Sequence, residues 1–228
     1  MKKPGSGPGL PTKIPQKFYK KAPLYPHQSC DMLWVYAPAA QLSQRRQQQM
    51  RGIILYHSKY GATCRYAQML AQQTGFVCRP VKETQGADLA PFDTVVFGGG
   101  IYASGIGGLP QLKKLLPQLQ GKRLFLFCVG ASPYDKETFQ QLREHNLQGE
   151  LAQAPLFYCR GAWNEEAMTF TDRTLCRLLQ RSLAKRDPAT YEPWQAALME
   201  GAGKGACDWS DPAYLVPLLA ALEDPSRP

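Results

Sequence analysis

Several features that would place a chain in a familiar class are missing from this sequence. None of its 228 residues lies in an apolar run of 18 or more, so the sequence predicts no transmembrane helix. Its seven cysteines form no C-x-x-C pair and its three histidines are scattered, so we expect neither a metal site nor a disulfide framework. There is no G-x-x-x-x-G-K-S/T motif, which disfavours a nucleoside triphosphatase.

Acidic residues are nearly absent from the first 49 residues, where basic residues are concentrated. This segment has eight lysines and arginines and one acid, Asp31, and so carries +7 of the formal net charge of +9. It is rich in Pro, Gly and Gln, without a sustained apolar period, which is typical of disorder. We interpret residues 1–49 as a basic leader rather than a nucleic-acid-binding arm. A strand pattern begins directly after Met50, which is therefore an alternative start of translation that would leave the leader untranslated.

Apolar runs and helical patterns alternate from Gly52 onward. The runs predict five strands, at residues 52–56, 76–78, 94–97, 123–129 and 155–159. Helical patterns lie between or after them, at residues 63–74, 109–119, 135–145 and 172–185. The last of these has Leu175, Leu178, Leu179 and Leu183 on one stripe, and Thr171 and Asp172 as candidate caps. This alternation predicts an α/β fold, with a parallel sheet covered by helices on both faces.

The length of this region selects between two doubly wound arrangements. Five strands within about 135 residues fit the order 2-1-3-4-5 better than the dinucleotide-binding order. In that order the ligand site lies at the carboxyl ends of strands one and three. The loop after the first strand contains Ser58, Gly61 and Thr63 and leads into a helix, a combination that is typical of an anion site. An ordinary capped helix is the alternative, because capping needs only one such hydroxyl.

Three segments together resemble the flavodoxin domain family. Residues 54–63 are similar to the flavodoxin phosphate loop, residues 95–105 to the strand-three loop, and residues 127–133 to the segment where strand four opens onto the flavin. Residues 157–161 and the helix after them resemble a bacterial subgroup that includes flavodoxin-like protoporphyrinogen dehydrogenase. The resemblance covers about residues 51–185. It implies a flavodoxin-like, doubly wound, five-stranded parallel sheet that binds FMN.

The resemblance also implies which residues hold the FMN. The phosphate is assigned to Ser58, Lys59, Tyr60, Gly61, Ala62 and Thr63. The ring and ribityl chain are assigned to Gly99, Gly100, Ile101, Tyr102 and Ala103, with Tyr102 as the stacking candidate. The third side is assigned to Gly130, Ala131, Ser132 and Pro133. No residue is assigned a catalytic role.

Two departures from the flavodoxin pattern affect the expected function. Lys59, Tyr60 and Ala62 stand where the common phosphate loop has more hydroxyls, and Lys59 would compensate with its charge. Flavodoxin electron carriers are usually strongly acidic, whereas residues 50–228 carry only +2. We therefore expect an FMN-dependent oxidoreductase that acts on a redox donor or acceptor protein or a small-molecule substrate, with protoporphyrinogen and quinones as the specific options that the resemblance implies. A non-catalytic flavin-binding or redox-sensing module, or a flavin-free interaction module, stays open.

The sequence also suggests a division of the chain and a location. Residues 50–185 are expected to form the FMN-binding domain, and residues 186–228 a helical extension. The extension has two short apolar helical stretches, at residues 194–199 and 214–222, which we expect to dock on the protein's own core. The leader does not have the pattern of a secretory signal, so the cytoplasm is the expected location.

Overall fold

The fold is described from a computed structural model, which defines residues 51–202 and 206–224. The basic leader expected over residues 1–49 and the alternative start at Met50 lie outside these residues.

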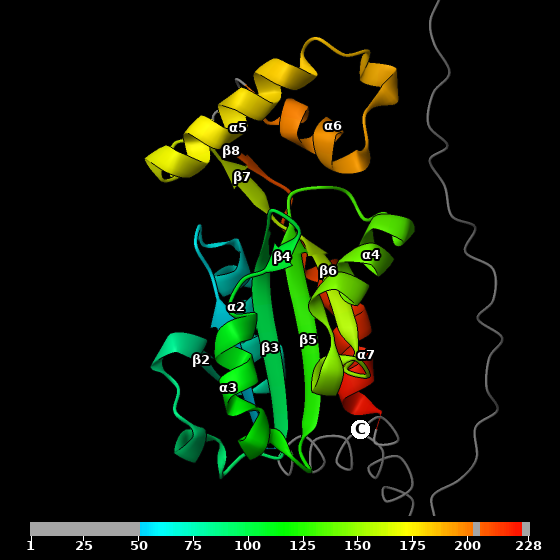
Figure 1. Ribbon diagram of the computed structural model, residues 1–228. Coiled ribbons are helices and arrows are strands. Elements are labelled where there is room, and N and C mark those ends of the chain that lie inside the picture. The colour runs from blue at the N-terminus through cyan, green and yellow to red at the C-terminus, as the bar shows by residue number, and fades with distance from the viewer. Residues whose placement is uncertain (1–50, 203–205, 225–228) are drawn as a thin grey trace, which may run out of the picture. The chain divides into compact units, whose positions relative to one another are not determined.

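A parallel sheet forms the centre of the described chain (Figure 1). Its strands are β1 (Gly52–His57), β2 (Val77–Pro80), β3 (Thr94–Tyr102), β5 (Arg123–Gly130) and β6 (Leu156–Arg160). They lie in the order β2-β1-β3-β5-β6, with all four pairings parallel. The short strand β4 (Gly105–Ile106) folds back antiparallel onto the end of β3. Without this hairpin the order is the predicted 2-1-3-4-5, so the predicted fold class is confirmed.

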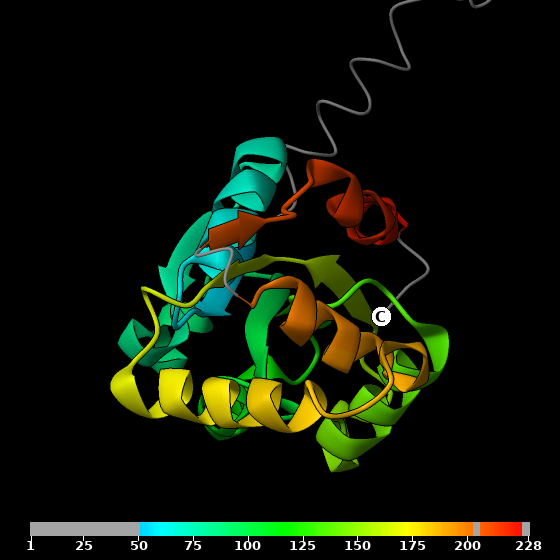
Figure 2. The same ribbon diagram turned by 90° about the horizontal axis from the view of Figure 1, so that it is seen from above.

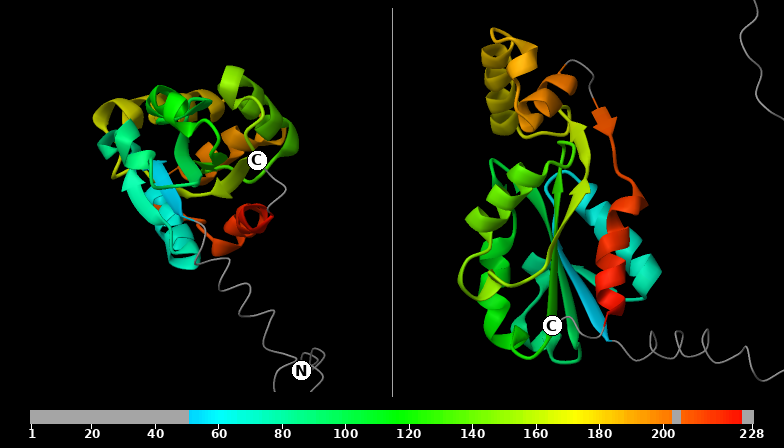
Figure 3. Two further views of the ribbon diagram at one scale, coloured as in Figure 1. Left: turned by 90° about the horizontal axis from the view of Figure 1, so that it is seen from below. Right: turned by 90° about the vertical axis from the view of Figure 1, so that its right-hand side faces the viewer.

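Helices cover both faces of the sheet, which explains why the central strands β1, β3 and β5 are largely apolar (Figure 3). One face packs against α3 (Leu109–Leu119) and α4 (Lys136–Asn146), and Ile53 and Leu55 of β1 point into this layer. The other face packs against α2 (Ala62–Thr74) and α7 (Val216–Glu223), and Ile54 of β1 points there. In the described part of the chain, five 3₁₀ helices complete the connections: Val81–Glu83, Gly86–Leu89, Gly149–Leu151, Pro188–Thr190 and Pro212–Leu215.

The chain makes a long excursion between β6 and α7. It forms β7 (Ala162–Asn164), α5 (Phe170–Leu183), α6 (Pro193–Glu200) and β8 (Ala206–Asp208), which pairs antiparallel with β7. We call this excursion the cap. Trp163, Leu183 and Leu198 form a small core inside it. Seen from above, α5 and α6 lie over the carboxyl ends of the strands (Figure 2).

The segment expected as a C-terminal extension contributes to two different parts of this architecture. Its first helix, α6, belongs to the cap. Its second helix, α7, packs into the sheet's own core, where Leu218 and Leu222 lie with Ile54 and Phe125. The chain thus returns to the sheet after residue 185, where the expected FMN-binding domain ends. Within the described residues, no helix has both the length and the apolar character needed to cross a bilayer.

The third strand is longer than the sequence predicts. β3 continues through Gly98, Gly99 and Gly100 to Tyr102, and these glycines pair with β5. Gly98 is required by close packing, because a Cβ there would lie 2.1 Å from Cζ of Phe127. A run of three glycines lacks the side chains that mark a strand in sequence, so the prediction ended the strand at residue 97 and was wrong.

The helix predicted at residues 172–185 also differs from the structure. It begins two residues earlier, at Phe170, and its cap is Thr169, whose hydroxyl accepts the Asp172 N–H. Thr171 and Asp172 lie inside the first turn of the helix, so the prediction that they are its N-cap residues is wrong. Of the leucine stripe, Leu183 is buried, whereas Leu175 and Leu178 are 53% and 55% exposed. The stripe is therefore not a core face over most of its length.

Candidate functional site

The carboxyl ends of β1, β3 and β5 meet beneath the cap and enclose a pocket of about 280 Å³, here called the small pocket. The first loop lines it with Ser58, Lys59, Tyr60, Ala62 and Thr63. The strand ends add Gly100, Ile101, Tyr102, Ala103, Val129, Gly130 and Ala131. The cap closes it with Ala162, Trp163, Met168, Asp172, Leu175 and Cys176. Three segments far apart in the sequence are thus brought to one cavity.

The loop after β1 is held in shape by its own hydrogen bonds. The Gly61 N–H donates to the Ser58 hydroxyl over 3.0 Å. Gly61 has φ 95° and ψ −29°, a left-handed conformation that favours glycine, and it precedes the first residue of α2. No acidic side chain lies in the first turn of α2, so the positive end of the helix dipole is left uncompensated by its own residues. The loop therefore offers a locally positive environment.

Two side chains of this loop converge on one carboxylate from the cap. The Lys59 ammonium and the Tyr60 hydroxyl both donate to Oδ2 of Asp172, which lies in the first turn of α5. Hydrogen bonding with Asp172 raises the pKa of Lys59, and hydrogen bonding with Lys59 and Tyr60 lowers the pKa of Asp172. The loop thus binds an anionic group, and that group is part of the chain.

Tyr102 is folded onto the same loop. Its hydroxyl accepts the Lys59 backbone N–H over 3.0 Å, and its ring meets the Tyr60 ring edge-on, with centroids 6.1 Å apart. The Lys59 ammonium lies 5.4 Å from the Tyr60 centroid and 5.9 Å from the Tyr102 centroid, within cation–π range. Burial raises the pKa of Tyr102, so its hydroxyl stays protonated. Lys59 and the two rings form one interacting group at the mouth of the loop.

Four of the residues expected at the site do not line the small pocket. Gly61 shapes the loop instead, through its left-handed backbone. A Cβ on Gly99 would meet the Gly107 carbonyl oxygen at 2.5 Å, so Gly99 packs against the connection that follows β4. Ser132 and Pro133 line a second cavity.

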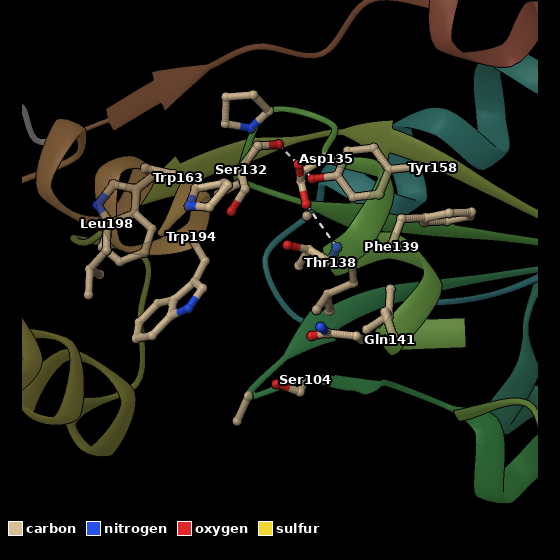
Figure 4. A pocket seen from close by; sticks show the side chains of 18 of the residues that line it. Ser104, Ser132, Asp135, Thr138, Phe139, Gln141, Tyr158, Trp163, Trp194 and Leu198 are labelled. Carbon is tan, nitrogen blue, oxygen red and sulfur yellow. Dashed lines mark hydrogen bonds between the residues drawn. The ribbon is translucent and has the colours of Figure 1, made fainter. Parts of the chain in front are cut away.

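This second cavity, here called the large pocket, measures about 720 Å³ and lies between α4 and the cap (Figure 4). Its aromatic side chains are Phe139, Tyr158, Trp163 and Trp194. It shares wall residues with the small pocket, among them Ile101, Ala103, Gly130 and Ala131. No sequence pattern predicts this pocket, because its outer wall is made by helices α5 and α6, whose position depends on the fold of the cap.

Two large side chains, Arg160 and Trp163, lie where β6 leads into the cap. Trp163 is buried and lines both pockets. The Arg160 guanidinium donates to the Ala131 carbonyl and to Glu200, and its Cζ lies 4.3 Å from the Trp209 centroid. Arg160 therefore fastens the cap to the end of β5. In residues 51–202 and 206–224, no three His, Cys, Asp or Glu side chains come together to hold a metal ion.

Comparison with known proteins gives the following likenesses. Among curated proteins, none matches this chain. The solved flavodoxin of Megasphaera elsdenii is 20% identical, with a TM-score of 0.35, over 47% of this chain and 82% of the flavodoxin. A Lactobacillus acidophilus flavoprotein solved in complex with FMN is 14% identical, with a TM-score of 0.33, over 49% of this chain and 92% of its own. The flavodoxin domain family matches residues 53–190, more than half of the sequence. The chain belongs to the flavodoxin domain family.

Proposed function

We propose that this chain binds FMN noncovalently in the small pocket and acts as an FMN-dependent oxidoreductase. One observation carries the proposal: Lys59 and Tyr60 converge on an anionic group beside the N-terminus of α2. A phosphate monoester is a stronger acceptor for the same two donors, because it carries more charge and more oxygens than a carboxylate. Membership of the flavodoxin domain family supports FMN as the source of that phosphate.

The residues present fit FMN in chemistry as well as in charge. Ser58, Lys59, Tyr60, Gly61, Ala62 and Thr63 would hold the phosphate. Gly100, Ile101, Tyr102, Ala103, Gly130 and Ala131 would face the ribityl chain and ring, and most of them are small or apolar. We also propose Gly99, Ser132 and Pro133 as residues of the FMN site, because they adjoin Gly100 and Ala131 in the sequence. Bound FMN would supply reversible electron transfer, and the protein would orient it and exclude water.

A small-molecule substrate is favoured over a purely electron-carrying role. The large pocket adjoins the small pocket and shares walls with it. Residues 50–228 also lack the strong acidic charge that would steer a basic redox protein. By resemblance to the protoporphyrinogen dehydrogenase-like subgroup, protoporphyrinogen and quinones are candidate substrates. A redox donor or acceptor protein remains the other candidate, and the cytoplasm remains the expected location.

One observation favours a second candidate, a flavin-free interaction or sensing module. Asp172 already satisfies the donors of Lys59 and Tyr60, so the loop is charge-compensated by the chain itself. A protein that had lost FMN would need such compensation, since an unpaired cation beside a helix N-terminus is unfavourable. The two candidates differ in whether FMN displaces the carboxylate.

The absorption spectrum of the full chain, before and after addition of FMN and gel filtration, separates these candidates. Retained flavin bands, with FMN released on denaturation, are expected. The Lys59→Ala variant should weaken binding at least tenfold, because it removes a charge-assisted hydrogen bond to the phosphate. Lys82→Ala is the matched control, because Lys82 is exposed and pairs only with the neighbouring Glu83. A full-length protein that elutes colourless at saturating FMN would leave the flavin-free module as the function.

A further inference from the structure

The large pocket has two chemically different sides. The cap side is apolar and consists of Leu175, Leu179, Trp194, Ala197 and Leu198, together with Pro193. The side formed by the β3–β4 turn, the β5 loop and α4 carries uncharged polar groups on Ser104, Ser132, Thr138 and Gln141 (Figure 4). An apolar body with oxygen atoms along one edge would satisfy both sides. The volume of about 720 Å³ lies in the usual range of small-molecule sites.

The apolar residues of the cap side are exposed although they are large. Leu179 and Trp194 are 38% and 39% exposed, and Leu175 more so. All three side chains line the large pocket, so their exposed apolar surface is gathered in one cavity and is not scattered over the protein surface. A concave apolar surface of this kind is typical of a ligand-binding site. Trp163 and Tyr158 extend the aromatic lining toward the walls shared with the small pocket.

The charges around the large pocket are unfavourable for an anion. None of the described residues that line it is lysine or arginine, whereas Asp135 contributes a carboxylate. Hydrogen bonding from the Thr138 N–H lowers the pKa of Asp135, so this carboxylate is charged at neutral pH. The nearest candidate cation on β6, Arg160, is engaged by the Ala131 carbonyl and Glu200. His145 is the only lining side chain in the described residues with a basic ring.

We propose that the large pocket is a second ligand site, which accepts an uncharged planar aromatic molecule with carbonyl or hydroxyl oxygens and disfavours anionic analogues through Asp135. This inference rests on the proposed function for placing that molecule next to a flavin, but its binding does not require FMN. Nicotinamide dinucleotides and carboxylated tetrapyrroles such as protoporphyrinogen, which are anionic, would find no lysine or arginine among the described lining residues of this pocket, so the inference narrows the candidate substrates to neutral ones.

The first test measures binding to the full chain by equilibrium dialysis, without FMN and at saturating FMN. The neutral probe is 2,3-dimethyl-1,4-naphthoquinone, whose substituted ring has no position open to addition of the Cys176 thiol. The anionic probe is 2-methyl-1,4-naphthoquinone-3-sulfonate, which has the same bicyclic ring. We expect the neutral probe to bind about tenfold more tightly, because the sulfonate carries a charge of the same sign as the Asp135 carboxylate and meets no lysine or arginine among the described lining residues.

Two substitutions test whether the probes bind in the large pocket. Asp135→Asn should tighten the sulfonate about fivefold and leave the neutral probe unchanged, because asparagine also caps a helix and keeps α4 in place. Trp194→Ala should weaken the neutral probe about tenfold, because it removes an aromatic wall. Phe170→Ala is its matched control, because Phe170 is the most exposed of the large apolar side chains on the cap and does not line the pocket.

The outcomes separate this inference from the proposed function. Unchanged affinity in Trp194→Ala, or an Asp135→Asn variant that discriminates against the sulfonate as strongly as the unaltered protein, would overturn the inference. Loss of neutral-probe binding at saturating FMN would also overturn it, because the probe would then occupy the small pocket. A chain that binds the neutral probe with this selectivity but does not bind FMN would support the second site and refute the proposed function.

Discussion

Asp172 on α5 and Lys59 in the loop after β1 form an ion pair across 113 residues of sequence. This pair, with the Tyr60 hydroxyl, fastens the cap to the loop that we propose for phosphate binding. Both side chains are partly exposed, so the pair itself adds little to stability. Its consequence is functional: the carboxylate and a phosphate compete for the same donors.

Replacement of Asp172 by asparagine should therefore tighten FMN binding. The neutral amide keeps the shape of the side chain but competes less well for the Lys59 ammonium. We expect a decrease of about fivefold in the Kd for FMN, measured by quenching of flavin fluorescence in low salt. Asp187→Asn is the control, because Asp187 lies elsewhere on the cap and asparagine preserves its capping role. Weaker FMN binding by Asp172→Asn would mean that the carboxylate positions Lys59 rather than competing with the phosphate.

Gly61→Ala should impair FMN binding as well as stability. A left-handed backbone with φ 95° costs an alanine about 1–2 kcal/mol relative to glycine. Space is not the cause, because nothing lies within 4 Å of the added Cβ. Gly121→Ala is a matched control, with φ 74° and an equally open site in the turn after α3. Both variants should lose similar free energy of unfolding in urea, whereas only Gly61→Ala should bind FMN at least fivefold more weakly. Equal FMN affinity in the two variants would argue against the loop as the phosphate site.

The strand order was predictable because each buried strand is a short apolar run with a helical pattern after it. Parallel strands covered on both faces leave that signal in any sequence. The cap was not predictable, because the leucine stripe of α5 has the period of a core helix although Leu175 and Leu178 are exposed. From sequence, Asp172 was predicted only to be a helix N-cap residue. Its contact with Lys59 could not be predicted, because the tertiary fold brings the two residues together. The loop residues were identified from local sequence, whereas their partners were not.

Alkaline pH should destabilise the fold through two buried groups. Burial raises the pKa of the Cys159 thiol to about 12, and burial also raises the pKa of Tyr66 to about 12. In the unfolded chain these groups have pKa values of about 8.5 and 10, so the folded state holds more protons between those values and 12. The free energy of unfolding should therefore fall as pH rises from about 9 toward 12.

Urea unfolding at several pH values checks this decline. Each group contributes at most about 1.4 kcal/mol per pH unit. Cys159→Ala should make the curve between pH 9 and 10 shallower but not flat, because the buried Cys128 thiol, whose pKa burial also raises, still titrates in the unfolded chain there. Val216→Ala is the comparison, because Val216 is 60% exposed and its side chain does not titrate, so it should leave the slope unaltered. A slope that is the same in all three proteins would contradict the assignment to Cys159.

The last prediction concerns whether the sheet can fold without the end of the chain. Leu218 of α7 is fully buried among Ile54, Val96 and Phe125, and the Arg123 guanidinium of β5 donates to the carbonyls of Ala221, Leu222 and Asp224. Leu218→Ala should cost about 2–5 kcal/mol of unfolding free energy, because a cavity opens against the sheet.

Val216→Ala is the matched control, because Val216 is on the same helix but 60% exposed, and it should cost less than about 0.5 kcal/mol. The transition should remain a single cooperative step in both variants, since α7 and the sheet share one core. If Leu218→Ala instead matched the control, α7 would be a dispensable attachment to the sheet. A loss in the expected range would mean that the flavodoxin domain of this chain is completed only after the cap, by residues 212–223.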